Sequence, residues 1–501
     1  MKHFFYGSLL LFSLSAYSQK EIASKYAATI TPSELKKKLT VIASASMEGR
    51  ETAMPGQKKA AAYIESYFKK IGLQPGVGTD YQLQFPVYQD SVESAVLNIN
   101  GTALAMSSDF TLQTSSFAAG NWSAKNIVFA SYGLSDSINN NFDGLDVKNK
   151  WVMVIDGTPA DMDNTPDAVS YQNYYANRQK TRNIKNKEVK GILIITKTLP
   201  SGTAASLKGN MYVDKTANAI PVIYITSSTA ALILKQPIDT FTKLKTIVRG
   251  IYPAALSFNE QKTTLNLQSS DVIGVLPGTD KKDEYVFVTG HYDHLGKQGN
   301  VIYYGADDDG SGTTSVLQIA TAFAQAKKKG NGPRRTMVFM TVSGEEKGLW
   351  GSEYYTAHPV FPLDKTDVDL NIDMVGRIDP DYKGDSLNYV YTIGEDKLSS
   401  DLLPISDSIN KKYSNMELDR RFNDPKDPNR FYYRSDHYNF AKNGVPVIFY
   451  FNGVHADYHK PTDTVDKINF DLMAKRDKLV FYTAWEMANR DSMLKRDIPL
   501  K

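Results

Sequence analysis

From about residue 266 to the C-terminus, short apolar runs alternate with stretches of helical periodicity, and this alternation constrains the fold more than any other feature. The apolar runs are DVIGVLPG, EYVFVTG, TMVFMTVSG, VDLNIDMVG, NYVYTIG and VPVIFYFNG. Helices are expected at about 311–328, 349–357, 397–411 and 470–490. Strands that alternate with helices usually form a mostly parallel sheet covered by helices. The sequence therefore predicts an α/β fold for this region.

Five polar clusters lie at or just beyond these apolar runs. They are GHYDHLG, GADDDGSG, SGEEKGLWGS, NIDMVGR and DYHKPTDT. Each cluster alone has a structural explanation, because Asp favours turns and helix caps. Sites in open α/β sheets, however, form at the carboxyl ends of the strands, where these clusters would meet. So much negative charge in one crevice needs neutralising, and two divalent metal ions would supply this.

The sequence contains no cysteine, so disulfides and thiolate ligands are excluded. A zinc site must then be built from His, Asp and Glu, which is typical of catalytic rather than structural zinc. Imidazole and carboxylate ligands suit zinc or another first-row ion. A formal net charge of +3 over 501 residues, without a basic stripe, argues against nucleic acid as a partner.

The N-terminus has the pattern of a secretory signal peptide. Residues 1–18, MKHFFYGSLLLFSLSAYS, have a basic start, a short apolar stretch and small residues near the end. The apolar run is shorter than the ~20 residues that span a bilayer. We therefore expect an exported protein, periplasmic or secreted, with no stable membrane insertion after removal of the signal. The remaining chain divides into 19–90, a β-rich insertion at 91–265, and the main domain at 266–501.

The ordered motifs GHYDHLG, GADDDGSG, SGEEKGLWGSEYY, NIDM and YHKPTDT resemble the co-catalytic zinc aminopeptidases of the M28 peptidase family. The segment SASMEGRETAMPGQKKAAAYIESYFKKIGLQPG at 44–76 resembles the N-terminal part of its bacterial secreted members. The β-rich insertion resembles the protease-associated domain that some members carry. The resemblance implies the zinc-peptidase fold, a three-layer α/β/α sandwich with a mostly parallel central sheet, plus the inserted protease-associated domain.

The resemblance also implies two zinc ions per chain, or another divalent metal, and a set of ligands. The implied ligands are His291 and Asp373 for one ion, Glu346 and His459 for the other, and Asp308 as the bridge between them. Asp307 and Asp309 flank the bridging position, so each is an alternative to Asp308.

Three further residues receive roles from the resemblance. Glu345 would be the general base, and Asp293 would orient the imidazole of His291. Tyr458 matches a position that supports the reacting carbonyl in some members, although simple packing is an equal explanation.

The other histidines have weaker signals. His294 is expected to support the site or the fold rather than to bind metal. His358 and His455 are expected to be ordinary loop or surface residues. Asp436 and His437, in YYRSDHYNFAKNGVP, would either contact substrate or belong to a structural hydrogen-bond network.

These expectations together predict an exported metallo-aminopeptidase that acts on peptides with a free N-terminus. A carboxypeptidase or dipeptidase of the same clan is the alternative within hydrolases. A binding protein on an inactive peptidase fold is the alternative outside enzymes, and the complete set of ligand and base positions argues against it.

Overall fold

The structure is a computed structural model that describes residues 21–115, 117–135, 140–157, 180–200, 207–215 and 219–500. The predicted signal peptide lies outside these residues. The chain separates into two compact units: the larger combines Met1–Pro86 with Gln268–Lys501, and the smaller is Val87–Leu267. Within the described part of the chain, no helix combines the length and the apolarity needed to cross a bilayer.

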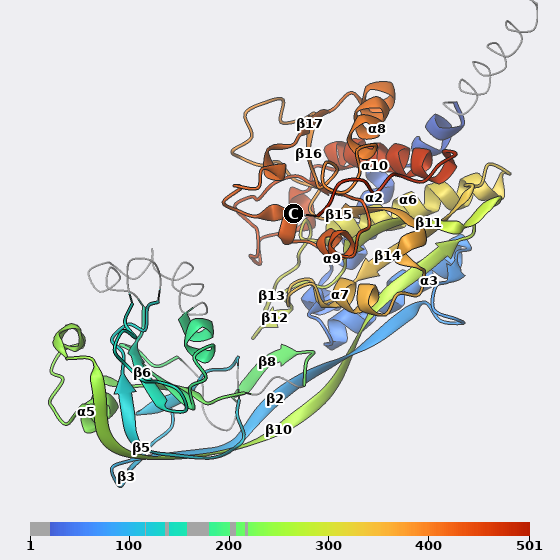
Figure 1. Ribbon diagram of the computed structural model, residues 1–501. Helices are drawn as coiled ribbons and strands as arrows, with labels where there is room; N and C mark the ends of the chain where they lie inside the picture. Colours follow the sequence, from blue (N-terminus) through green and yellow to red (C-terminus); the bar gives the residue numbers. More distant parts are fainter. Residues whose placement is uncertain are drawn as a thin grey trace, which may run out of the picture. The chain divides into compact units, whose positions relative to one another are not determined.

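The larger unit is built on a mostly parallel sheet, as predicted (Figure 1). Its strands, in spatial order, are β17 (Glu417–Asp419), β16 (Tyr389–Ile393), β18 (Val447–Phe451), β15 (Thr366–Ile372), β11 (Lys281–His291), β14 (Arg335–Val342) and the end of β10 (Gly250–Leu276). Strand β11 pairs in parallel with β14 and β15, β15 with β18, and β16 with β17. The β10–β14 and β16–β18 pairs are antiparallel.

Two apolar layers cover the two faces of this sheet, because successive side chains of a strand point in opposite directions. In β14, Met337 and Phe339 belong to one buried cluster, and Val338 and Met340 belong to the other. The first cluster is closed by α2 (Pro32–Ile42), α3 (Pro55–Ile71), α6 (Gly310–Lys328) and α10 (Phe470–Asn489). The second is closed by α7 (Trp350–Ala357) and α9 (His437–Lys442). The predicted three-layer sandwich is confirmed.

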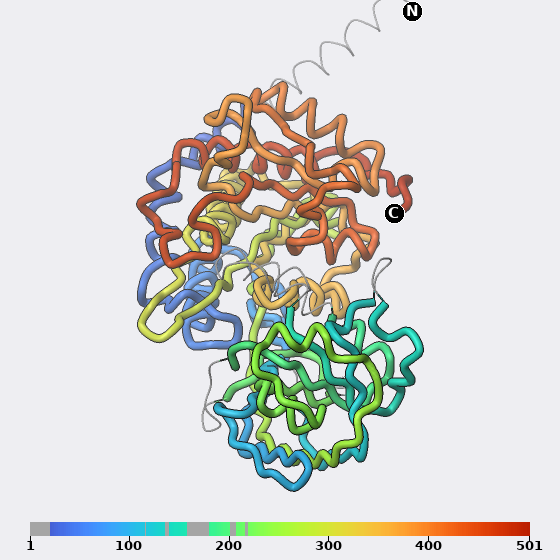
Figure 2. The backbone as a smooth tube through the Cα atoms, turned by 90° about the vertical axis from the view of Figure 1, so that its left-hand side faces the viewer, coloured from blue at the N-terminus to red at the C-terminus, as the bar shows by residue number. Residues whose placement is uncertain are grey.

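Both ends of the chain contribute to the larger unit. Helix α2, blue in Figure 2, packs against the C-terminal helix α10, drawn in red. The side chain of Thr31 caps α2 by accepting a hydrogen bond from the Glu34 backbone N–H at 3.3 Å. Helix α3 ends at Gly72, whose φ of 83° is the left-handed conformation that glycine adopts without strain. Local sequence therefore sets these helix ends.

One helix is shorter than the sequence pattern predicts. Helix α8 covers Leu402–Ile409, whereas the periodicity favours 397–411. Pro404 explains the late start, because proline lacks an N–H and is tolerated only in the first turn of a helix. The helix can therefore begin only just before this residue.

The smaller unit is also rich in β-strands. Strands β5 (Gly120–Phe129), β6 (Trp151–Ile155), β7 (Gly191–Ile195) and β9 (Val222–Ile225) are parallel neighbours. In β6, Trp151 and Met153 face one apolar cluster, and Val152 and Val154 face another. The unit is thus a β-rich body with its own core, and its identity as a protease-associated domain stays a prediction.

Candidate metal centre

The predicted ligands lie at one edge of the larger unit's sheet. His291 is the last residue of β11, and Asp373 directly follows β15. Glu346 lies just beyond β14, His459 lies in the segment after β18, and Asp308 precedes α6. Strands β14, β11, β15 and β18 are parallel neighbours, so their carboxyl ends meet at this edge.

One group of potential ligands consists of His291, Asp308 and Asp373, all of them buried. The His291 Nε2 atom lies 3.3 Å from Asp308 Oδ1 and 3.7 Å from Asp373 Oδ1. The same Nε2 atom is buried, and it has no hydrogen-bond partner among the described residues. Zinc bonds of 2.0–2.1 Å in a tetrahedron place neighbouring ligand atoms about 3.3 Å apart. The spacing of these three atoms therefore fits one divalent ion.

A second group lies on the other side of Asp308. The His459 Nε2 atom is 3.0 Å from Asp308 Oδ2 and 3.1 Å from Glu346 Oε2. Asp308 thus turns one carboxylate oxygen to each group. The donors are imidazole nitrogen and carboxylate oxygen throughout, which suits zinc or a similar first-row ion. These residues fit a pair of ions that share one carboxylate.

The structure also separates Asp308 from its two aspartate neighbours. Asp309 accepts hydrogen bonds from the backbone N–H groups of Gly312, Met374 and His291, at 2.8, 3.0 and 3.1 Å. Its carboxylate is therefore committed to the backbone.

Asp307 is occupied in a similar way. It accepts a hydrogen bond from the Gly376 N–H at 2.7 Å and lies 3.2 Å from His455 Nε2. His455 lies in a loop, as one of the two expectations held, but it is buried, so the expected surface position is wrong. His358, in contrast, is exposed as expected.

The cluster of carboxylates changes the acidity of the imidazoles. Burial disfavours the charged form of His291, but Asp373 and Glu345 outweigh it and raise the pKa of His291 well above its usual range. Burial likewise opposes the charge on His459, yet Asp308 and Glu346 raise its pKa to about 10. The site therefore attracts positive charge, which divalent ions would provide in place of protons.

Asp293 contacts more than the His291 ring. The His291 Nδ1 atom lies 3.1 Å from the Asp293 backbone oxygen and 3.6 Å from its carboxylate. The carboxylate accepts hydrogen bonds from the Thr52 hydroxyl at 2.6 Å and from the Glu345 N–H at 3.2 Å. The backbone carbonyl is thus the nearer partner of the ring, and the carboxylate holds the Glu345 loop.

His294 has a partner that the sequence did not reveal. It is buried, and its Nδ1 atom lies 2.7 Å from Glu346 Oε1 and 3.9 Å from Asp308 Oδ2. His294, Asp308 and Glu346 also lie close enough together to hold an ion. His294 contacts the Oε1 atom of Glu346, and His459 contacts the Oε2 atom. The contact with His294 therefore leaves Oε2 free for the second ligand group.

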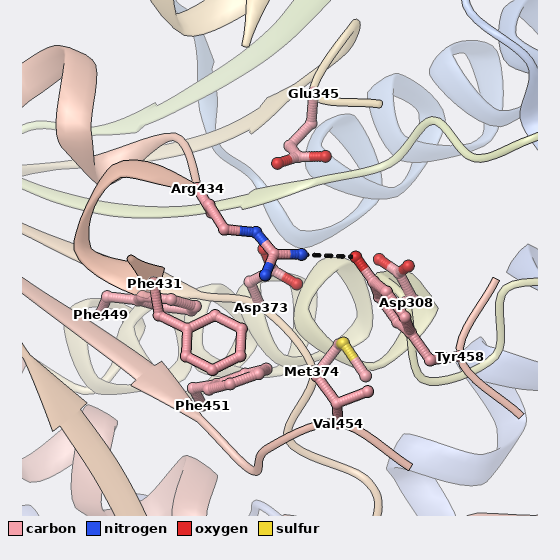
Figure 3. Close-up of a pocket in the computed structure, with 10 residues that line it drawn as sticks. All are labelled: Asp308, Glu345, Asp373, Met374, Phe431, Arg434, Phe449, Phe451, Val454 and Tyr458. Carbon is pink, nitrogen blue, oxygen red and sulfur yellow. Dashed lines mark hydrogen bonds between the residues drawn. The ribbon is translucent and has the colours of Figure 1, made fainter. Parts of the chain in front are cut away.

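A pocket adjoins the two ligand groups (Figure 3). Its lining residues are Asp308, Glu345, Asp373, Met374, Phe431, Arg434, Phe449, Phe451, Val454 and Tyr458. The Tyr458 ring stacks on the His459 ring, with centroids 3.9 Å apart, and its hydroxyl accepts a hydrogen bond from Arg434 at 3.4 Å. Tyr458 therefore both packs against a ligand and lines the pocket.

The segment YYRSDHYNFAKNGVP reaches the site through residues that its sequence did not single out. Ser435 donates a hydrogen bond to Asp373 at 2.6 Å, and Arg434 lines the pocket. Asp436 is buried and accepts from the Ser352 hydroxyl. His437 is also buried. The latter two side chains belong to the supporting structure rather than to the pocket wall.

The fold and the paired ligand groups define a candidate two-metal site on a three-layer α/β sandwich. Residues 271–484 match the model of Peptidase family M28. This match confirms the resemblance of the motifs to that family.

Known proteins similar to the chain include both sequence relatives and solved structures. A probable leucine aminopeptidase of Trichophyton verrucosum is 29% identical over 221 residues, which cover 43% of this chain and 56% of that protein. The chain matches 56% to 64% of the length of this and the two next curated relatives.

Two solved structures share the fold over almost the whole chain. An aminopeptidase from Aneurinibacillus sp. strain AM-1 superposes with a TM-score of 0.58 at 20% identity, covering 96% of this chain and all of that one (100%). A zinc aminopeptidase from Bacillus subtilis gives 0.55 at 19% identity, covering 94% and 99%. At this level of identity the likeness establishes the fold alone.

Proposed function

We propose that this chain is an exported two-zinc aminopeptidase that removes the N-terminal residue of peptides. The observation that carries the proposal is the placement of the Asp308 carboxylate, with Oδ1 3.3 Å from His291 and Oδ2 3.0 Å from His459. His291 and Asp373 would hold one ion, and Glu346 and His459 the other. When bound, two zinc ions would lower the pKa of a water molecule toward 7 and polarise the scissile carbonyl.

Glu345 is the proposed general base. Its carboxylate lines the pocket but belongs to neither ligand group, and it lies 4.0 Å from His291 Nε2. Burial raises the pKa of Glu345 well above its usual range, with Glu346 and Asp373 adding to the effect. A carboxylate with a raised pKa can take the proton of the attacking water and pass it to the departing amine nitrogen. The Asp293 carboxylate would keep Glu345 in place by accepting a hydrogen bond from the Glu345 backbone N–H.

Tyr458 and the pocket carboxylates would bind the peptide. The Tyr458 hydroxyl lines the pocket and could donate to the carbonyl oxygen as negative charge develops on it. The free amino group of a peptide is positively charged, and Glu345 offers a carboxylate beside the ligand groups. This charge pattern supports a substrate with a free N-terminus.

The test compares two neighbouring glutamates. Glu345→Gln is expected to keep two zinc ions per chain and to lose leucine p-nitroanilide turnover by at least about a thousandfold. Glu346→Gln, the matched control, is expected to lose bound zinc as well, measured by elemental analysis. Retained turnover in Glu345→Gln would contradict the assigned base. Cleavage of an N-acetylated peptide but not its free-amine form would instead favour a carboxypeptidase.

A further inference from the structure

Arg434 differs from the other residues that line the pocket. It is the one basic side chain among the described residues of the lining. Its guanidinium carbon lies 4.9 Å from the centre of the Phe431 ring, and one nitrogen donates to the Tyr458 hydroxyl at 3.4 Å. In Figure 3 the guanidinium group points into the pocket, on the side facing Tyr458. The Arg434 residue is exposed, so a ligand can reach its guanidinium.

Within the described part of the chain, no carboxylate oxygen lies within 4.0 Å of the Arg434 guanidinium. Two other arginines of the larger unit do have such partners: Arg377 pairs with Asp457 at 3.0 Å, and Arg421 pairs with Asp419 at 2.5 Å. Three carboxylates line the same pocket, yet they are turned toward the ligand groups. The guanidinium is thus available for a group that is not part of the protein.

The charges of the site point to the kind of group. Asp308, Glu345, Glu346 and Asp373 carry four negative charges when ionised, and two divalent ions would balance them. Arg434 adds one further positive charge to the pocket, because a guanidinium keeps its proton at any physiological pH. Its planar N–H groups match a carboxylate, which they can bind through two parallel hydrogen bonds.

We propose that Arg434 binds a carboxylate of the peptide substrate and makes the site selective for peptides with an anionic group beside the scissile bond. This inference rests on the proposed peptidase function. The carboxylate could come from an acidic side chain of the N-terminal residue or from the C-terminus of a dipeptide. The apolar walls formed by Phe431, Phe449 and Phe451 would hold the hydrocarbon part of the substrate.

Two substrate pairs, assayed with the zinc-loaded full chain, distinguish these sources. Leu-Gly against Leu-Gly-amide isolates the terminal carboxylate, and glutamyl against glutaminyl p-nitroanilide isolates the side chain. Arg434→Gln is expected to lower kcat/KM for the anionic member of at least one pair by roughly 10- to 100-fold relative to its neutral partner, as for a charge-assisted hydrogen bond. Arg434→Lys should restore part of the selectivity.

Arg430→Gln is the matched control. Arg430 is four residues away, stacks on Tyr433 at 4.9 Å and does not line the pocket. The Arg430→Gln variant loses the same charge as Arg434→Gln, but outside the pocket. Both selectivity ratios should therefore stay within about twofold of the wild type.

A change in the dipeptide ratio identifies the terminal carboxylate, and a change in the anilide ratio identifies the acidic side chain. Unchanged ratios in both pairs would overturn the proposal. If Arg434 only positioned Tyr458, Arg434→Gln would lower kcat/KM equally for anionic and neutral substrates. The selectivity ratios would then also stay unchanged.

A binding measurement separates this proposal from the peptidase assignment. Calorimetry on the zinc-loaded Glu345→Gln protein, in which turnover should be lost, compares leucine with leucinamide and glutamate with glutamine. In at least one pair the carboxylate should bind more tightly to this protein than to the same protein with Arg434→Gln added. Equal affinities in both pairs would overturn the role of Arg434. Failure of the zinc-loaded wild type to cleave any leucyl substrate would instead refute the proposed function.

Discussion

Replacing Arg50 with methionine would remove a buried guanidinium that ties three segments of the larger unit together. Its side chain is fully buried and donates to the backbone oxygens of Tyr292, Ile42, Tyr304 and Gly305, at 2.7, 2.9, 2.8 and 2.9 Å. Tyr292 lies between His291 and Asp293 in the sequence. Arg50 thus joins the end of α2 to the loop after β11 and to the turn that leads into Asp308.

The expected loss of unfolding free energy follows from these four backbone oxygens, which would lose their donor. Each buried oxygen left without a donor costs about 1–3 kcal/mol, and methionine restores the packing of the side chain but none of the hydrogen bonds. We therefore expect Arg50→Met to lose at least about 4 kcal/mol of unfolding free energy, a large part of the 5–15 kcal/mol typical of a domain. Burial lowers the pKa of Arg50 to about 10, so the group is still charged at pH 7.

Urea unfolding of the wild type and the variant, followed by circular dichroism, measures this loss. Zinc affinity should fall with it, because Tyr292 directly follows the proposed ligand His291. Arg421→Met is the control, since its exposed pair with Asp419 should contribute about 1 kcal/mol or less. A loss for Arg50→Met no larger than that of the control would refute the reasoning.

Three further predictions concern the bridge, the core and a buried acid. Asp308→Asn should reduce bound zinc from two ions to fewer than one per chain by elemental analysis, and an unchanged content would exclude it as the shared ligand. Phe68→Ala should cost about 3–5 kcal/mol in denaturant unfolding, because the ring is fully buried between α3 and the sheet. Burial raises the pKa of Asp477 to about 8, so folding holds a proton that the unfolded chain releases near pH 4. Asp477 should therefore contribute a loss of stability, on the order of a few kcal/mol, as pH rises from 4 to 8. Asp477→Asn should make the slope of stability against pH shallower over this range, and an identical slope in the variant would contradict the assignment.

Much of the architecture follows from periodicity and local chemistry. The alternation of apolar runs and helical stretches predicts the parallel sheet, and the structure places the helices on both of its faces. Thr31 and Gly72 mark helix ends because capping and left-handed turns depend on neighbouring residues only. Helix α8 also begins late for a local reason, because Pro404 is tolerated only in the first turn of a helix.

The composition of the candidate site also follows from the sequence. Motifs at strand ends, without cysteine, limit the possible ligands to imidazole and carboxylate groups. A parallel sheet then brings these motifs to one edge, because its strands share a direction.

Only the tertiary structure decided which members of each motif face the ligand groups. Three consecutive aspartates look alike in the sequence, but backbone N–H groups occupy Asp309, and His455 approaches Asp307. His294 meets Glu346, which lies 52 residues further along the chain. Such contacts depend on the direction of each side chain in a folded loop, and that direction is fixed by packing between distant segments. The sequence by itself therefore determined the fold class and the chemistry of the ligands, whereas long-range packing decided how each group is used.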